Sequence, residues 1–217
     1  MMVADTYRHK GMRNKLVEVI KRKGIEDARV LVAIGKVARH VFFDEAFINH
    51  AYEDKAFQIG EGQTISQPYT VAYMTEWLAL EPGMKVLEVG TGSGYQACVL
   101  QEMGAKVFSI ERIRALHDKA KKILPLLGYA SIKTFYGDGY AGLPAYAPFD
   151  RIIITAAATT IPEKLLKQLK TGGIMILPLG SDDNQVMVRI TKTSAHDYKK
   201  EAGDAFRFVP MLPGKVS

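Results

Sequence analysis

Hydrophobic residues change their spacing about a third of the way along the 217-residue chain. Before residue 85, amphipathic patterns predict helices, whereas after it short apolar runs alternate with helical patterns. Strands that alternate with helices pair in parallel, so the alternation predicts a doubly wound α/β sheet. The predicted helices are 9–23, 26–38, 69–80, 94–103, 113–127 and 162–170, and the strands are 85–89, 106–110, 131–135, 149–155 and 173–178.

The remaining segments have weaker patterns. Residues 41–57 show little period and are interpreted as irregular structure packed on the core. Residues 185–191 and 205–209 alternate less clearly and predict antiparallel edge strands near the C-terminus. We expect one structural unit in two parts, an N-terminal helical extension over 1–68 and a core over 69–217.

The composition is typical of a folded protein in a reducing compartment. Hydrophobic residues make up 47% of the chain, and the single cysteine, Cys98, excludes an internal disulfide framework. No apolar run approaches the roughly 20 residues that a membrane-spanning helix needs. The basic N-terminus lacks the apolar segment of a secretory signal. We therefore expect a cytoplasmic protein with no membrane association.

The formal charge of +6 and the pI near 9.2 raise the question of a nucleic-acid partner. The basic residues are dispersed, and the densest groups, at 21–23 and 119–122, lie on predicted helices. The sequence has no metal-ligand spacing and no aromatic strand of an RNA-binding module. We therefore expect neither a metal nor a nucleic-acid partner, and the oligomeric state stays open.

Residues 86–94, V-L-E-V-G-T-G-S-G, combine a buried strand with a glycine-rich turn. Glycine lets the backbone come close to a ligand because it has no Cβ, although a tight turn alone would also use it. The dinucleotide fingerprint G-x-G-x-x-G would need glycine at position 95, which is Tyr95. The pattern E-x-G-x-G-x-G instead resembles motif I of the S-adenosylmethionine-dependent methyltransferases. The resemblance implies that this cofactor contacts Glu88, Gly90, Thr91, Gly92 and Gly94.

Acidic residues follow at the ends of the next two predicted strands. Glu111 follows the run 106–110, where an ionised carboxylate accepts hydrogen bonds from ribose hydroxyls. A solvated charge paired with a neighbouring arginine is the alternative. Asp138 follows the run 131–135 and is placed to meet the exocyclic amine of adenine. The sequence thus predicts further cofactor contacts for Glu111, Arg112, Asp138 and Gly139.

A second group of motifs is more specific. The segment G-E-G-Q-T-I-S-Q-P-Y at 60–69 and T-A-A-A at 155–158 accompany the glycine motif. Over most of its length the chain resembles the protein-L-isoaspartate (D-aspartate) O-methyltransferases, which repair age-damaged proteins. The resemblance implies a Rossmann-like fold of class I methyltransferases. It also implies methyl transfer from S-adenosyl-L-methionine to the free α-carboxyl group of L-isoaspartyl residues in damaged proteins and peptides. The ester would then close to a succinimide.

The resemblance also implies roles on the substrate side. Ser66 matches the catalytic position, where its hydroxyl would orient the substrate carboxylate, although a loop serine often bonds its own backbone. Gln63 and Thr64 would help to form a lid over the cofactor. An isoaspartyl carboxylate is already ionised at pH 7, so no general base is needed. The residues expected to line the substrate cleft are Ile65, Ser66, Val209 and Pro210.

Two other functions remain open from the sequence. The first is a methyltransferase that acts on RNA or on a small carboxylate, for which the basic pI is the only support. The second is a non-catalytic relative that binds the cofactor without turnover, because a fold alone does not specify an activity. The first would bind oligonucleotides with a steep salt dependence. The second would bind the cofactor and release no methylated product.

Overall fold

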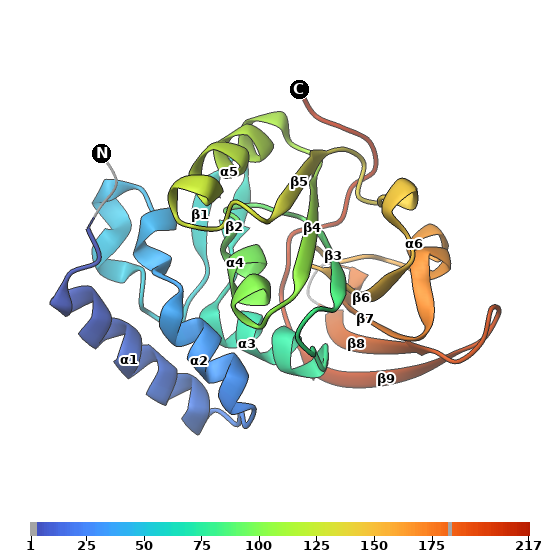
Figure 1. Ribbon diagram of the computed structural model, residues 1–217, viewed down its shortest axis with the longest axis horizontal. Coiled ribbons are helices and arrows are strands. Elements are labelled where there is room, and N and C mark those ends of the chain that lie inside the picture. The colour runs from blue at the N-terminus through green and yellow to red at the C-terminus, as the bar shows by residue number, and fades with distance from the viewer. Residues whose placement is uncertain (1–3, 182–183) are drawn as a thin grey trace.

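A mixed β-sheet forms the middle of the molecule (Figure 1). The computed structural model describes residues 4–181 and 184–217, and within them the main sheet has the order β5-β4-β3-β6-β7-β8-β9. Neighbouring strands from β5 to β7 are parallel, whereas β7, β8 and β9 pair antiparallel. The strands are β3 (Lys85–Val89), β4 (Lys106–Glu111), β5 (Lys133–Tyr136), β6 (Phe149–Ile154), β7 (Leu169–Ser181), β8 (Asn184–Lys192) and β9 (Tyr198–Ala205).

Two hydrophobic clusters cover the opposite faces of this sheet. Successive side chains of a strand point to opposite sides, so Val86 and Leu87 of β3 belong to different clusters. The cluster of Val86 packs against α1 to α5, and the cluster of Leu87 contains Leu165 of α6. The helices are α1 (Tyr7–Arg22), α2 (Ala28–Lys36), α3 (Pro68–Trp77), α4 (Tyr95–Glu102), α5 (Arg114–Leu126) and α6 (Glu163–Gln168).

The N-terminal helices share the core of the sheet. Asp27 caps α2 by accepting a hydrogen bond of 2.8 Å from the backbone N–H two residues later. Leu16 of α1 and Ile34 of α2 lie in the same cluster as the strand residues on that face. The helices α1 and α2, which belong to the expected extension, therefore pack in the same cluster as residues of the expected core.

The segment between α2 and α3 is more regular than the sequence predicts. Short 3-10 helices have no 3.6-residue repeat, and the hairpin strands that follow them are only three or four residues long. Neither kind of element therefore produces a clear hydrophobic repeat in the sequence. The elements are η1 (Arg39–Phe42), η2 (Glu45–His50), β1 (Phe57–Gly60) and β2 (Gln63–Ile65), and a further 3-10 turn, η3 (Pro144–Tyr146), precedes β6.

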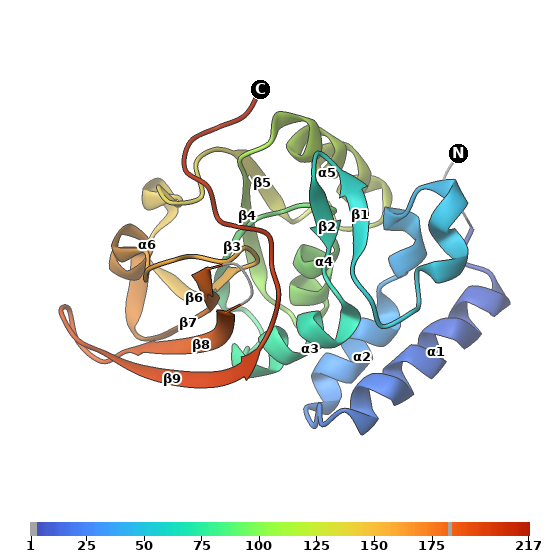
Figure 2. The same cartoon turned by 180° about the vertical axis from the view of Figure 1, so that it is seen from behind.

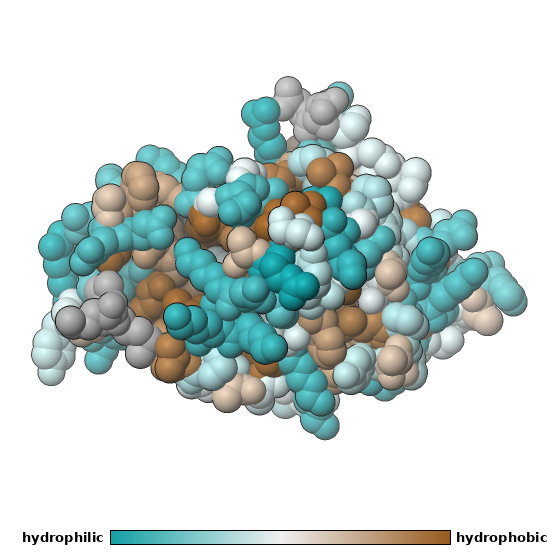
Figure 3. Space-filling model, turned by 90° about the horizontal axis from the view of Figure 1, so that it is seen from above, coloured by the Kyte–Doolittle hydropathy of each residue, from teal (hydrophilic) through white to brown (hydrophobic). Residues whose placement is uncertain are grey.

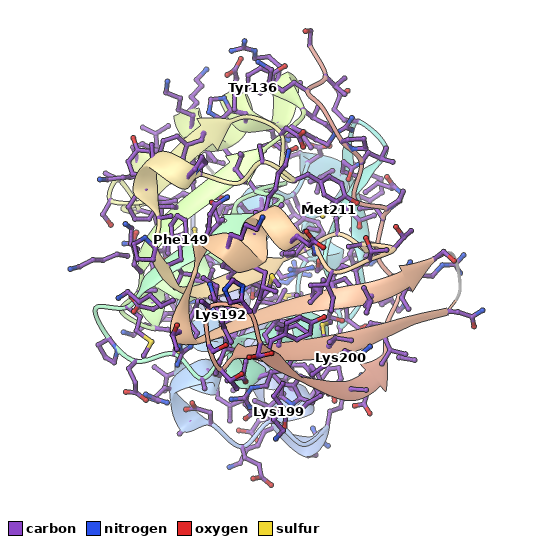
Figure 4. All side chains as sticks on the ribbon, turned by 90° about the vertical axis from the view of Figure 1, so that its right-hand side faces the viewer. Tyr136, Phe149, Lys192, Lys199, Lys200 and Met211 are labelled. Atoms are coloured by element: carbon purple, nitrogen blue, oxygen red, sulfur yellow. The ribbon has the colours of Figure 1, made fainter. Side chains whose placement is uncertain are left out.

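The predictions for the last strands are partly wrong. β7 begins at Leu169, four residues before the expected start, and β9 ends at Ala205, where a strand was expected to begin. β9 lies at the edge of the sheet and carries Lys199 and Lys200, which Figure 4 labels. Edge strands carry charged residues that discourage further pairing, so their sequences resemble loops.

The outer surface is mixed in character. Viewed from above, hydrophobic residues form separate patches with hydrophilic residues between them (Figure 3). In the described residues, no helix combines the length and the apolar character required to span a membrane.

Candidate active site

A cavity of about 300 Å³ lies at the carboxyl ends of β3, β4 and β6. Ligands of open α/β sheets bind outside these strand ends, and the volume is within the range of small-molecule sites. Val89, Ile110 and Thr155 stand at or just beyond the three strand ends and line the cavity. The segments that complete its wall are 62–66, 90–93, 95–96, 111–113 and 209–212, with Val71, Gly139 and Ala156.

The glycine loop after β3 comes close to β6 and requires glycine at position 90. Gly90 has a φ of +98°, which side-chain-bearing residues rarely adopt, and a Cβ there would collide with Thr155 Oγ1. That hydroxyl donates a hydrogen bond of 2.8 Å to the Gly90 carbonyl. The loop backbone is therefore exposed to the cavity at a fixed position.

Glu111 holds the loop from the end of β4. Its two carboxylate oxygens accept hydrogen bonds of 2.9 Å from the backbone N–H groups of Gly92 and Ile113. The side chain is 5% exposed and faces the cavity. Because an ionised carboxylate can accept about four hydrogen bonds, acceptor capacity remains for a ligand with hydroxyl groups.

Glu88 lies behind the cavity wall and does not line it. The side chain is fully buried, and the Ser109 hydroxyl donates a short hydrogen bond to its carboxylate. Ser109 in turn lies 2.6 Å from the hydroxyl of Thr91, which does line the cavity. Burial raises the pKa of Glu88 to about 8. The structure thus does not bring Glu88 to the cavity, and its carboxylate is linked to the cavity wall through Ser109 and Thr91.

Gly94 and Asp138 also lie outside the lining. Gly94 precedes α4 with a φ of +89°, and a Cβ there would lie 3.0 Å from Leu124 Cδ2, so the glycine permits close helix packing. Asp138 Oδ1 accepts a hydrogen bond of 2.9 Å from the backbone N–H of Tyr140. The other predicted cofactor residues line the cavity: Gln63, Thr64, Gly90, Thr91, Gly92, Glu111, Arg112 and Gly139.

The substrate-side residues line the same cavity as the glycine loop. Gln63, Thr64 and Ile65 come from β2, and Ser66 follows it directly. Val209 and Pro210 reach the cavity from the other end of the chain. The structure thus brings together two groups of residues that lie more than 100 positions apart in the sequence.

The segment after β9 crosses the carboxyl ends of the strands (Figure 2). The backbone of Ala157 donates to the Val209 carbonyl at 2.8 Å and accepts from Met211 N–H at 2.7 Å. The Tyr140 hydroxyl donates to the Met211 carbonyl at 3.2 Å. Met211, labelled in Figure 4, and Leu212 line the cavity, and sequence reasoning missed both. Their position directly after Val209 and Pro210, which were predicted to line the substrate cleft, was the available signal.

Sequence reasoning also missed Tyr95 and Gln96, the first two residues of α4. Both line the cavity, although each is at most 7% exposed. Burial raises the pKa of Tyr95 to about 12, so its hydroxyl stays protonated. Tyr95 stands where a dinucleotide-binding loop would carry its third glycine. This difference was the sequence signal that could have pointed to Tyr95 as a lining residue.

Three potential metal ligands meet outside the cavity. Polar atoms of Asp5, His9 and His40 lie within 4.8 Å of one another, a proximity that the sequence spacing did not indicate. The Arg13 guanidinium donates hydrogen bonds of 3.0 and 3.2 Å to the Asp5 carboxylate. The His40 ring forms a hydrogen bond of 2.7 Å with the Tyr52 hydroxyl. The stacked rings of His9 and His40, with centroids 3.9 Å apart, join α1 to η1, and we assign no metal to this group.

The cavity fits the shape and polarity of S-adenosyl-L-methionine. The glycine loop presents its backbone to the cavity, and Glu111 offers acceptors for ribose hydroxyls. Val89, Ile110 and Ile113 add apolar walls for a flat ring. The family model described as protein-L-isoaspartate (D-aspartate) O-methyltransferase matches residues 11–215. The chain belongs to this family.

Similar proteins agree with this assignment. The chain is 54% identical over 208 residues to the protein-L-isoaspartate O-methyltransferase of Cytophaga hutchinsonii, and the match covers 96% of this chain and 94% of that protein. It is 54% identical over 211 residues to the protein of the same name from Christiangramia forsetii, and the match covers 97% of this chain and 99% of that protein. The near-complete coverage extends the family similarity to the N-terminal helices and to the segment after β9.

Solved structures of the family have the same fold. One protein-L-isoaspartate O-methyltransferase superposes with a TM-score of 0.83 at 31% identity, over 91% of this chain and 65% of that longer chain. The chain therefore spans about two thirds of the length of that protein. A second, described as a putative protein-L-isoaspartate O-methyltransferase from Plasmodium falciparum in complex with S-adenosyl-L-homocysteine, has a TM-score of 0.81 at 28% identity, with 92% and 98% covered.

Proposed function

We propose that the protein transfers a methyl group from S-adenosyl-L-methionine to the free α-carboxyl group of L-isoaspartyl residues in damaged proteins and peptides. The observation that carries the proposal is the single cavity lined by both the glycine loop and Ser66. A cofactor on the loop and a carboxylate at Ser66 would meet inside it. We further propose that the protein works in the cytoplasm and without a nucleic-acid partner.

The residues on the cofactor side would bind and orient. Gly90 and Gly92 present backbone to the ligand, and Glu111 would accept hydrogen bonds from the ribose. Thr91, held by Ser109, would keep the loop at its position. When bound, the cofactor supplies the activated methyl group, so the protein needs no metal or nucleophilic side chain of its own.

Ser66 would orient the acceptor. An isoaspartyl carboxylate is ionised at neutral pH and needs no proton removed before it reacts. The Ser66 hydroxyl would donate a hydrogen bond to one carboxylate oxygen and leave the other directed toward the methyl group. Orientation of two reactants is worth up to about 7–11 kcal/mol in favourable systems. Val209 to Leu212 would exclude water from the same space.

Methyl transfer to a defined peptide tests this proposal. We expect S-adenosyl-L-methionine with a radiolabelled methyl group to label a short L-isoaspartyl peptide, in a base-labile form, and to leave the matched aspartyl peptide unlabelled. Ser66→Ala should lower kcat and keep the cofactor Kd. Cofactor binding without label on either peptide would favour a non-catalytic relative. Label on both peptides would contradict the proposed specificity.

A further inference from the structure

A buried arginine stands directly behind the serine segment. Arg39, in η1, has no exposed surface, and it does not line the cavity. Its Nη2 donates a hydrogen bond of 2.8 Å to the backbone carbonyl of Ser66. A second, longer bond of 3.4 Å joins the same nitrogen to the Lys55 carbonyl. The guanidinium therefore fixes the backbone of Ser66, which lines the cavity.

The same guanidinium contacts the cofactor side of the cavity. Its central carbon lies 4.7 Å from the ring centroid of Tyr95, the first residue of α4, and 5.5 Å from that of Phe43. A cation over an aromatic ring at these distances is attracted to it. Since Tyr95 directly follows the glycine loop and lines the cavity, Arg39 joins the Ser66 segment to the start of α4.

The charge of Arg39 is expensive to bury. Among the described residues, no carboxylate forms an ion pair with it, and its Nε and Nη1 make no hydrogen bond. Burial lowers the pKa of Arg39 to about 10, and the nearby Tyr95 hydroxyl and Asp54 carboxylate offset only part of that effect. Buried charges are usually paired, and an apolar residue of similar volume is often neutral or stabilising at such a site. Core stability alone therefore does not account for an arginine here.

Asp54 holds the other side of the same segment. Its side chain accepts hydrogen bonds of 3.0 Å from the Gln67 amide and of 2.8 Å from the backbone N–H of Tyr69. Lys23 pairs with the same carboxylate at 2.5 Å. Asp54 thus anchors the start of α3, whereas Arg39 holds Ser66, two residues before the helix begins. The two contacts leave the Ser66 backbone little freedom.

We propose that Arg39 is the positioning residue for Ser66, and that it sets the direction of the serine hydroxyl by holding the Ser66 carbonyl while its guanidinium packs on the Tyr95 ring. This inference rests on the proposed function, because Ser66 matters only if a carboxylate acceptor binds beside it. Arg39 does not touch the substrate. Its removal should therefore slow methyl transfer and leave cofactor binding intact.

Two substitutions at Arg39 test the role. Arg39→Met removes the donor to Ser66 and keeps most of the volume, and Arg39→Lys keeps a cation that can still donate. We expect Arg39→Met to lower kcat about 10- to 100-fold, the effect of misplacing a reacting group, with the cofactor Kd within about twofold. Arg39→Lys should recover part of the rate. Arg151→Lys is the matched control, because Arg151 is 9% exposed and, among the described residues, its guanidinium donates only to carbonyls, those of Leu78, Ala79 and Asp150.

Combination with Ser66→Ala separates positioning from a general structural effect. If Arg39 acts through the Ser66 hydroxyl, Arg39→Met should slow the Ser66→Ala enzyme by less than about twofold. Equal slowing with and without Ser66 would overturn the proposal, as would a parallel loss of cofactor affinity and thermal stability. If Arg39→Met does not fold, the same comparison with and without Ser66→Ala is made with Arg39→Lys, and the same two outcomes support or overturn the proposal. An inactive wild-type protein would instead defeat the proposed function itself.

Discussion

The position of Glu111 at the end of β4 lets its carboxylate bond the glycine loop and face the cavity at the same time. Its carboxylate already accepts hydrogen bonds from Gly92 and Ile113, and it still faces the cavity. One side chain therefore fixes the glycine loop and offers acceptors to the ligand. The sequence predicted the second task from the position of the residue at a strand end. It did not indicate the first, since a hydrogen bond to the loop depends on how closely β3 and β4 lie.

Replacement of Glu111 should weaken cofactor binding. We expect Glu111→Ala to reduce the binding free energy of S-adenosyl-L-methionine by about 1.5–3 kcal/mol, the range for hydrogen bonds to a charged group. Glu111→Gln keeps one acceptor and should lose less. Titration calorimetry of both variants measures the difference. An unchanged Kd in Glu111→Ala would show that the ribose lies elsewhere.

Glu88 makes stability depend on pH. Burial raises its pKa from the ordinary 4.5 to about 8, so the folded protein keeps a proton that the unfolded chain releases above pH 4.5. The free energy of unfolding should therefore fall as the pH rises from about 4.5 to about 8, by on the order of a few kcal/mol. Glu88→Gln, which keeps a hydrogen-bonding group for Ser109, should remove this part of the slope. Urea unfolding at pH 5 and pH 8 compares the two proteins, and identical slopes would contradict the assignment.

At the scale of the element, the loop from β3 to α4 is specified by backbone geometry. Gly90→Ala should weaken cofactor binding by at least about tenfold, because φ is +98° and the new methyl group would collide with Thr155. Gly24→Ala is the control: Gly24 has a φ of +103°, but open space surrounds its Cβ position. Both variants should lose stability, and only Gly90→Ala should raise the cofactor Kd. Equal Kd values would mean that the loop does not contact the ligand.

Elements with a clear hydrophobic repeat could be predicted from the sequence, and elements without such a repeat could not. β3 has the bounds that its apolar run predicts, because both of its faces are buried. β9 was misplaced because its exposed edge carries charged residues instead of an alternating pattern. The hairpin β1–β2 was missed for a related reason, since it is short and pairs only with itself. Its strand Gln63–Ile65 nevertheless contains predicted site residues, which the motif located without the strand.

At the scale of the whole molecule, motifs located both halves of the cavity, but not the contacts that join them. The glycine loop and the Ser66 segment each have a signature within a few residues of sequence. Arg39 has none, because its effect depends on the folding of η1 behind the serine. Glu88 was predicted to contact the ligand because a sequence motif does not show which of its residues line the cavity and which lie behind the lining.

The segment from Val209 to Leu212 reaches the cavity through contacts with residues distant in sequence, such as Ala157 and Tyr140. A few hydrogen bonds hold this segment, whereas continuous ladders of strand pairs hold the central sheet, so the segment should dissociate at a lower free energy than the central strands. A folding intermediate with the parallel strands and the glycine loop would therefore hold only one wall of the cavity. In a refolding experiment, ligand affinity should return with the slowest phase, after most secondary structure. Binding would then distinguish the native protein from compact intermediates that circular dichroism does not separate from it.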